Sequence, residues 1–234
     1  MTILSAFARA LAQAADGRFL RVLLLGLGLT LALLAAATAL VVWLVGWLAP
    51  DTVSLPLIGE IGWVDTVLSV GSVALMLVLS VVLMVPVASA FTGVFLEQVA
   101  DAVEDRHYPD LAPVPPVPFL DTLRDSAAFL VVLVAVNLAA LVLYLFVGPF
   151  APLLFWAVNG FLLGREYFQL VAMRRLGRQG AIAARRRHAG TIWLAGTLMA
   201  IPLTIPVMNL VIPILGVATF THLFHALEPE RGLQ

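Results

Sequence analysis

The chain has 234 residues, of which 62% are hydrophobic and only 12% are charged, and its formal net charge is −1. Globular proteins are about 45–50% apolar, so a soluble domain of this length would leave too much apolar surface in water. We therefore expect one membrane domain with an all-α fold. The chain has no cysteine, which excludes disulfides, thiolate metal sites and cysteine nucleophiles.

The N-terminal segment predicts an amphipathic helix followed by a membrane-spanning helix. Residues 2–16 place Ile3, Phe7 and Leu11 on one helical face and polar side chains on the other. This spacing is typical of a helix that lies in the membrane interface. Residues 22–49 carry no charge, and as a helix they extend over about 42 Å, which is enough to cross a bilayer with some tilt.

A second long transmembrane helix is predicted over residues 63–107. A helix of this length extends over about 67 Å, more than twice the hydrocarbon core, so one end projects from the membrane. The projecting end is the charged segment EQVADAVEDRHY at 97–108. Pro109 and the PVPPVP stretch at 113–118 end the helix and form a stiff connector.

Residues 119–173 predict a first helical hairpin, with uncharged arms at 126–147 and 150–163 joined by a Gly-Pro pair. The second arm meets Arg165 after about 22 Å, short of the ~30 Å core, which favours a re-entrant hairpin. The first arm is long enough to span, so whether this pair spans or only dips stays open. A basic loop at 174–188, with six arginines, is expected to follow.

A second hairpin is predicted over residues 190–227, which contain no Asp, Glu or Arg up to the C-terminal tail. Three prolines interrupt it: Pro202, Pro206 and Pro213. If they act as helix breakers, the regular arms 191–201 and 213–226 extend over about 16 and 21 Å, and neither spans comfortably. We favour a re-entrant hairpin whose tip at 207–212 is buried among neighbouring helices or subunits. The alternative is a pair of proline-kinked spanning helices.

The arginines indicate the orientation of the chain. All basic residues are arginine, and they fall on one side of the membrane if the chain turns back at 50–62, 148–152 and 205–213. Basic residues concentrate on the cytoplasmic side. Both termini are therefore expected in the cytoplasm.

Three segments resemble the CysZ sulfate-permease family and its broader etoposide-induced-protein superfamily. They are FTGVFLEQVADAVEDRHYP at 91–109, NGFLLGREYF at 159–168 and IPVMNLVIPILGVATFT at 205–221. The resemblance implies an amphipathic N-terminal helix, two long transmembrane helices and two hemi-penetrating helical hairpins. It also implies a homo-oligomer in the bacterial inner membrane that passes sulfate inward to supply cysteine biosynthesis.

Candidate anion-binding residues are Arg18, Arg21 and Asn209. The two arginines stand where the first long helix begins, and a helix N-terminus with guanidinium groups beside it favours anions; proteins that resemble CysZ carry a basic pair near this point. The alternative role is to set topology. Asn209, just before the helix start expected at Pro213, resembles a half-helix end that faces a midplane site, with backbone capping as the alternative.

Five residues are candidates for structural ion pairs. Arg165 and Glu166 lie at the foot of an arm, where we expect an ion pair with another helix, or of Glu166 with one of the nearby arginines. Glu97, Asp101 and Glu104 lie three or four apart on one face of the projecting helix. We expect them to pair with arginines of the 174–187 segment and to hold this side of the protein together.

No catalytic, metal or nucleotide-binding motif is present, so an enzyme, a cofactor or a nucleic-acid partner is not expected. The leading hypothesis is a passive or proton-coupled sulfate transporter or channel of the CysZ type. The alternative is a non-transporting membrane scaffold or envelope protein of the same fold, because fold does not imply function.

Overall fold

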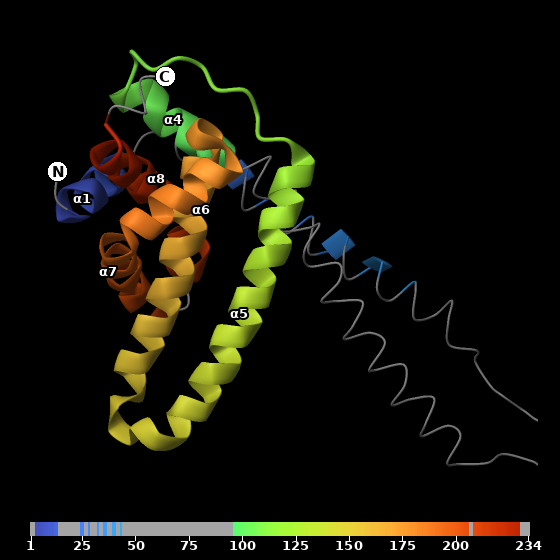
Figure 1. Cartoon of the computed structure of the whole chain (residues 1–234), viewed down its shortest axis with the longest axis vertical. Coiled ribbons are helices and arrows are strands. Elements are labelled where there is room, and N and C mark those ends of the chain that lie inside the picture. The colour runs from blue at the N-terminus through green and yellow to red at the C-terminus, as the bar shows by residue number, and fades with distance from the viewer. Residues whose placement is uncertain are drawn as a thin grey trace, which may run out of the picture.

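The structure, a computed structural model, describes residues 3–13, 96–205 and 208–229 together with isolated positions between 24 and 43. Every element within these residues is helical, which confirms the all-α prediction for them. Figure 1 shows a long hairpin of two helices that projects from a cluster of shorter ones. The two long transmembrane helices predicted at 22–49 and 63–107 lie outside the described residues, except for those isolated positions and the end of the second helix.

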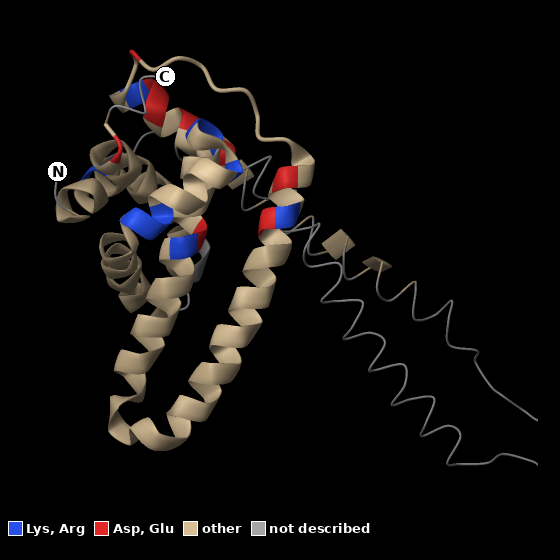
Figure 2. Ribbon diagram, viewed as in Figure 1, with Lys and Arg blue, Asp and Glu red and all other residues tan. Residues whose placement is uncertain are grey.

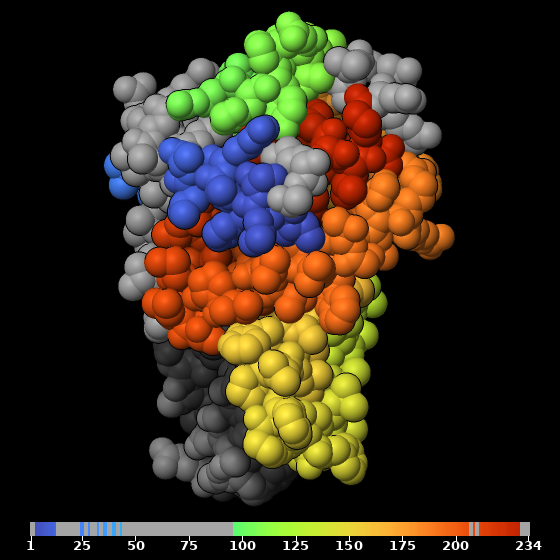
Figure 3. Space-filling model, turned by 90° about the vertical axis from the view of Figure 1, so that its left-hand side faces the viewer, coloured from blue at the N-terminus to red at the C-terminus, as the bar shows by residue number. Residues whose placement is uncertain are grey.

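The helix α1, Ile3–Gln13, lies within the segment predicted to be amphipathic. Ala6 and Ala10 are fully buried, whereas Leu4 and Leu11 are more than half exposed. The helix packs on α8, and Figure 3 shows it on the surface of the helical cluster. Its small side chains therefore face the protein, and its exposed leucines are free to contact lipid, as expected of an interfacial helix.

The helix α4, Glu97–His107, ends where the sequence analysis placed the end of the projecting helix. The amide of Tyr108 donates to the carbonyl of Glu104 at 2.7 Å, and the chain leaves the helix at Pro109. Residues 112–118 are irregular and connect α4 to the first hairpin. Proline explains both features, since it ends a helix and then keeps the connector from resuming one.

The first hairpin consists of α5, Phe119–Val147, a 3₁₀ turn at Gly148–Phe150, and α6, Ala151–Arg187. Gly148 has φ +51°, a conformation that residues with a side chain rarely adopt, which explains the glycine at the tip. The apolar side chains of α5 face outward along most of its length, and Phe146 is 80% exposed. By length and composition, this hairpin contains a helix able to cross a membrane.

The segment 174–188, expected to be a basic loop, is instead the helical end of α6. The helix passes through Arg165 without interruption, breaks at Gly177 (φ 64°, ψ 174°) and then resumes to Arg187. Arginine and alanine are good helix formers, so a concentration of positive charge does not require a loop. The single glycine supplies the left-handed conformation that redirects the helix.

The second hairpin consists of α7, Ala189–Ala200, a 3₁₀ turn at Ile201–Thr204, and α8, Met208–Leu227. The first arm ends before Pro202, as expected. The second arm begins at Met208 rather than at Pro213, which lies inside α8. Proline there removes one hydrogen bond, and packing on three neighbouring helices outweighs that loss. As a result, α8 extends over about 30 Å instead of 21 Å, while α7 extends over about 18 Å.

The core lies between α8 and the helices α4 and α6. Phe220 and Phe224 of α8 are fully buried, and the Phe224 ring lies 6.0 Å from that of Phe168 in α6. By contrast, α6 and α7 pack through glycine. A side chain on Gly164 would place its Cβ 2.5 Å from the carbonyl oxygen of Ile192. Small residues let two helices approach closely in this way, and this contact fixes α7 beside the charged part of α6.

Candidate anion site at the charged end of the helices

The charged residues of the described helices gather at the end of the molecule away from the hairpin tip (Figure 2). Between residues 126 and 164 there is no charged side chain at all. Four groups of charges stand at this end: a network on Glu104, an ion pair on Glu228, a pocket with carboxylates and a pocket with arginines. Each involves residues of more than one helix or segment.

The network centres on Glu104 of α4, whose side chain is only 6% exposed. Arg175 of α6 binds it through two nitrogens, with Nη2 at 2.8 Å from Oε2 and Nε at 3.3 Å from Oε1. Nη1 of Arg174 lies 3.3 Å from Oε2, and Nε2 of His225 in α8 lies 2.9 Å from Oε1. Arg174 also forms an ion pair with Asp101. The network therefore joins α4, α6 and α8, and both acids meet arginines of the segment that the sequence analysis named.

The environment of Glu104 strongly favours its charged form. Burial alone would raise the pKa of this carboxyl. Hydrogen bonds from His225 and Arg175 and the charge of Arg174 outweigh that effect and lower the pKa to about 2. A buried carboxylate that is held by two arginines and a histidine resists protonation, and removal of either arginine leaves a poorly compensated buried charge.

A second ion pair fastens the end of α8 to the junction of α6 and α7. Nη2 of Arg187 lies 2.5 Å from Oε1 of Glu228, and Nε2 of His188 lies 3.1 Å from the same oxygen. Burial opposes the charge of Glu228, but hydrogen bonds from these two residues lower its pKa. This contact holds the C-terminal end of α8 against the junction of α6 and α7.

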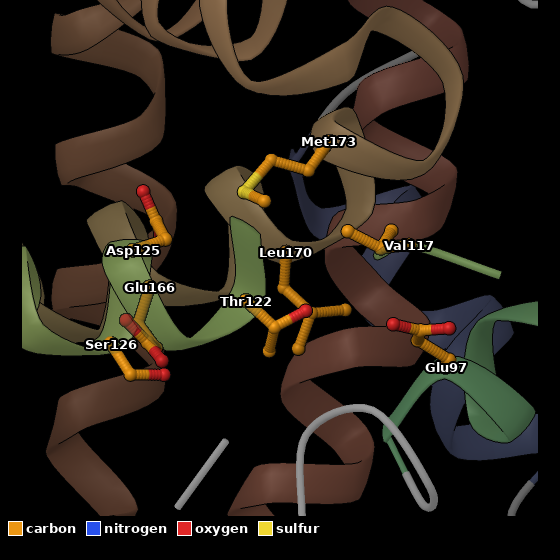
Figure 4. A pocket seen from close by; sticks show the side chains of 8 residues that line it. All are labelled: Glu97, Val117, Thr122, Asp125, Ser126, Glu166, Leu170 and Met173. Atoms are coloured by element: carbon orange, nitrogen blue, oxygen red, sulfur yellow. The ribbon is translucent and has the colours of Figure 1, made fainter. Parts of the chain in front are cut away.

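The pocket with carboxylates is lined by Glu97, Asp125 and Glu166 together with the hydroxyls of Thr122 and Ser126. In Figure 4, Glu166 lies beside Ser126, while Glu97 lies on the other side of Thr122. Burial raises the pKa of Glu97. Neither Glu97 nor Glu166 has an ion-pair partner among the residues that the structure describes. Both side chains line the pocket, and the charges of Arg174 and Arg165 act on Glu97 and Glu166, respectively. The ion pairs predicted for these two residues stay predictions.

The pocket with arginines lies in the angle between α6 and α7 and has a volume of about 90 Å³. Arg165 comes from α6 before its break, and Arg185 and Arg186 come from α6 after it. Trp193 of α7 forms one wall, and its indole nitrogen donates to the carbonyl of Ala157 at 2.9 Å. Arg165 is 9% exposed, and its guanidinium lies over the ring of Phe129, 5.2 Å from the centroid. It has no ion pair within the described part of the chain, although its charge opposes the rise in the pKa of Asp125 that burial causes. The ion pair predicted for Arg165 stays a prediction.

A family model described as "Sulfate transporter CysZ/Etoposide-induced protein 2.4" matches residues 6–213. The chain belongs to this family. The match confirms the resemblance seen in the sequence and, together with the long apolar hairpin, indicates a membrane protein. No curated protein matches the chain significantly.

The residues predicted to bind the anion of this CysZ-family protein remain predictions. Arg18 and Arg21 lie outside the described residues. Asn209 is in the first turn of α8, upstream of Pro213, and its side chain is outside the description. The helix start predicted at Pro213 is at Met208 in the structure.

Sequence reasoning missed the arginine pocket and the role of Asp125. Oδ1 of Asp125 accepts a hydrogen bond from Gln169 at 3.4 Å, and Gln169 in turn accepts one from Nε of Arg185 at 3.2 Å. The signal that was available is Gly177. A glycine amid an arginine-rich helix permits a change of direction that brings distant arginines together.

Proposed function

We propose that this protein transports sulfate across the bacterial inner membrane, as a channel or transporter of the CysZ type that supplies sulfate for assimilation. The observation that carries the proposal is the family match, which covers residues 6–213 of the 234. The family description names sulfate transporters, and a match of this extent includes the whole first hairpin and the second hairpin as far as Pro213.

The distribution of charge supports a role in the membrane. The uncharged parts of α5 and α6 form a hairpin with outward-facing apolar side chains, and the charges collect at its base. This arrangement suits a hairpin that enters the bilayer while its base stays at the cytoplasmic surface, with both termini on that side. The proposal includes a homo-oligomer in which the re-entrant tips line the path between subunits.

Arg18 and Arg21 are proposed to recruit sulfate at the start of the first long helix, where guanidinium groups and the helix N-terminus act together. Asn209, near the start of α8, is proposed to face the path deeper in the membrane. The sequence contains no nucleotide-binding motif, so transport is proposed to be passive or coupled to protons.

The test is uptake of labelled sulfate into liposomes that contain the purified protein. We expect uptake by the wild type, and its loss in the double variant Arg18→Ala/Arg21→Ala while assembly persists. Arg124→Gln is the matched control, since this side chain is 62% exposed at the start of α5 and loses the same charge away from the site. If the correctly assembled wild type shows no uptake above that of empty liposomes, the transport proposal is wrong and the scaffold hypothesis takes its place.

A further inference from the structure

We propose that the pocket formed by Arg165, Arg185 and Arg186 is an oxyanion-binding site, separate from the site proposed at Arg18 and Arg21. Its ligand class is a tetrahedral oxyanion with two negative charges or a phosphate group. The inference deepens the proposed function, on which it rests only for the identity of sulfate as the natural ligand. The binding chemistry itself follows from the pocket.

The break at Gly177 creates the pocket. Nε of Arg185 lies 3.2 Å from Oε1 of Gln169, although 16 residues separate the two. In a straight α-helix these residues would be about 24 Å apart. The break folds the last part of α6 back along the first, so that Arg185 and Arg186 line one pocket with Arg165.

The three guanidinium groups outnumber the two carboxylates that interact electrostatically with Arg165, those of Asp125 and Glu166. No Asp or Glu forms an ion pair with any of them in the described part of the chain. Asp125 interacts electrostatically with both Arg165 and Arg185. It is shared, however, because its Oδ1 also accepts a hydrogen bond from Gln169 and lies 3.9 Å from Nε of Arg178. Glu166, next to Arg165 in sequence, lines the other pocket. A cluster of positive charge thus remains around the cavity.

Arg165 adds most to the cost of this cluster. The residue is 91% buried and has no ion pair in the described part of the chain, and a buried cation without a close opposite charge is unfavourable. The ring of Phe129 offsets only part of that cost, because a cation–π contact is weaker than an ion pair. An oxyanion in the pocket would accept hydrogen bonds from a guanidinium fork and supply the missing charge.

The size and walls of the pocket suit a small oxyanion. Its volume of about 90 Å³ is well above the roughly 15 Å³ that one water requires. Phe161, Ile192 and Trp193 provide apolar walls beside the three guanidinium groups. The same chemistry has two possible sources: free sulfate, or the phosphate of a lipid headgroup at the membrane surface.

The test measures binding of sodium sulfate to the purified full-length protein in a neutral detergent, by isothermal titration calorimetry and by Trp193 fluorescence. Sodium chloride at equal ionic strength serves as the reference salt. A second arm measures the binding of phosphatidylglycerol to the protein in nanodiscs. Arg186→Gln is the decisive variant, because this exposed side chain is the least needed for folding. Arg124→Gln is the matched control.

We expect Arg186→Gln to weaken sulfate binding about tenfold, as loss of one charge-assisted contact does, and Arg124→Gln to leave it unchanged. Arg186→Lys should recover part of the affinity, and Trp193→Phe should remove the fluorescence change but not the heat of binding. If only phosphatidylglycerol shows dependence on Arg186, the site holds and its ligand is a lipid phosphate. If neither arm depends on Arg186, the proposal is wrong.

The outcome is separable from that of the proposed function. If liposomes take up sulfate but sulfate binding does not depend on Arg186, the proposed site is wrong and the transport proposal stands. Binding that depends on Arg186 in a protein that shows no uptake would establish the site and overturn transport.

Discussion

Glu104 is held by Arg174, Arg175 and His225 at once, from two helices other than its own. All four side chains are at most 6% exposed. Asp101, one turn earlier, also pairs with Arg174, but its side chain is 58% exposed. Exposed ion pairs contribute little to stability, whereas loss of one partner from a buried pair is strongly destabilising. Asp101 and Glu104 are therefore expected to differ in their effect on stability although they share Arg174.

The contribution of the Glu104 carboxylate to the stability of the protein should depend on pH. Its pKa is lowered from 4.5 to about 2, so its contribution is complete above about pH 4.5 and is lost as the pH falls toward 2. The shift corresponds to a contribution on the order of 3 kcal/mol. We expect Glu104→Gln to melt at a lower temperature than the wild type at about pH 6, with the difference shrinking as the pH falls through this window.

The measurement is thermal unfolding of the detergent-solubilised protein at a series of pH values. Asp101→Asn serves as the control and should shift the melting temperature much less than Glu104→Gln does, because Asp101 is exposed. Equal melting temperatures for Glu104→Gln and the wild type near neutral pH would show that the network does not hold the helices together.

At the scale of the elements, the contact between α6 and α7 depends on glycine. Gly160 and Gly164 of α6 face Gly196 and Ile192 of α7, and a Cβ at Gly164 would lie 2.5 Å from a backbone oxygen. Backbone cannot move aside as a flexible side chain can, so the helices would have to separate. This contact also sets the wall of the arginine pocket, since Trp193 lies one residue after Ile192.

We therefore expect Gly164→Ala to destabilise the protein by about 1–3 kcal/mol, as overpacking typically does. Gly190→Ala is the matched control: nothing lies within 4 Å of a Cβ there, and alanine is the better helix former. Thermal unfolding and size-exclusion chromatography in detergent measure both variants. If Gly164→Ala is as stable as Gly190→Ala, the two helices are not as closely packed as the structure has them.

At the scale of the whole molecule, the separation of charged and apolar residues limits how deeply the first hairpin can enter the membrane. The uncharged part of α5, residues 126–147, extends over about 33 Å, whereas α6 meets Arg165 after only about 22 Å. The first length would cross the hydrocarbon core and the second would not. The proposal of a re-entrant first hairpin therefore depends on α6, whose arginine stays with the charges at the base.

Labelling of single cysteines tests this proposal, because the chain has no cysteine of its own. We expect Phe146→Cys, at the hairpin tip, to resist a membrane-impermeant thiol reagent added to intact cells, since a re-entrant tip stays within the bilayer. Asp110→Cys should react only after the cytoplasmic side is exposed. Ser54→Cys, in the connection predicted to lie outside, is the positive control. Labelling of Phe146→Cys from outside would show that the hairpin spans.

The sequence by itself determined the features that depend on local chemistry. Pro109 ends α4, Gly148 makes the turn between α5 and α6, and Pro202 ends the regular part of the next arm. The all-helical class and the family followed from hydrophobic runs and from motifs along the chain. These features depend on neighbours in sequence, because proline removes a backbone donor and glycine permits positive φ wherever they occur.

Only the tertiary structure decided which charges meet. The helical spacing placed Glu97 and Glu104 on one face, yet Glu104 binds two arginines while Glu97 faces a pocket. Pro213 reads as a helix start, but packing on neighbouring helices lets α8 begin a turn earlier. The arginine pocket depends on the direction in which α6 continues after Gly177. A glycine allows such a change of direction without specifying it, and the contacts that select one direction join residues far apart in the chain.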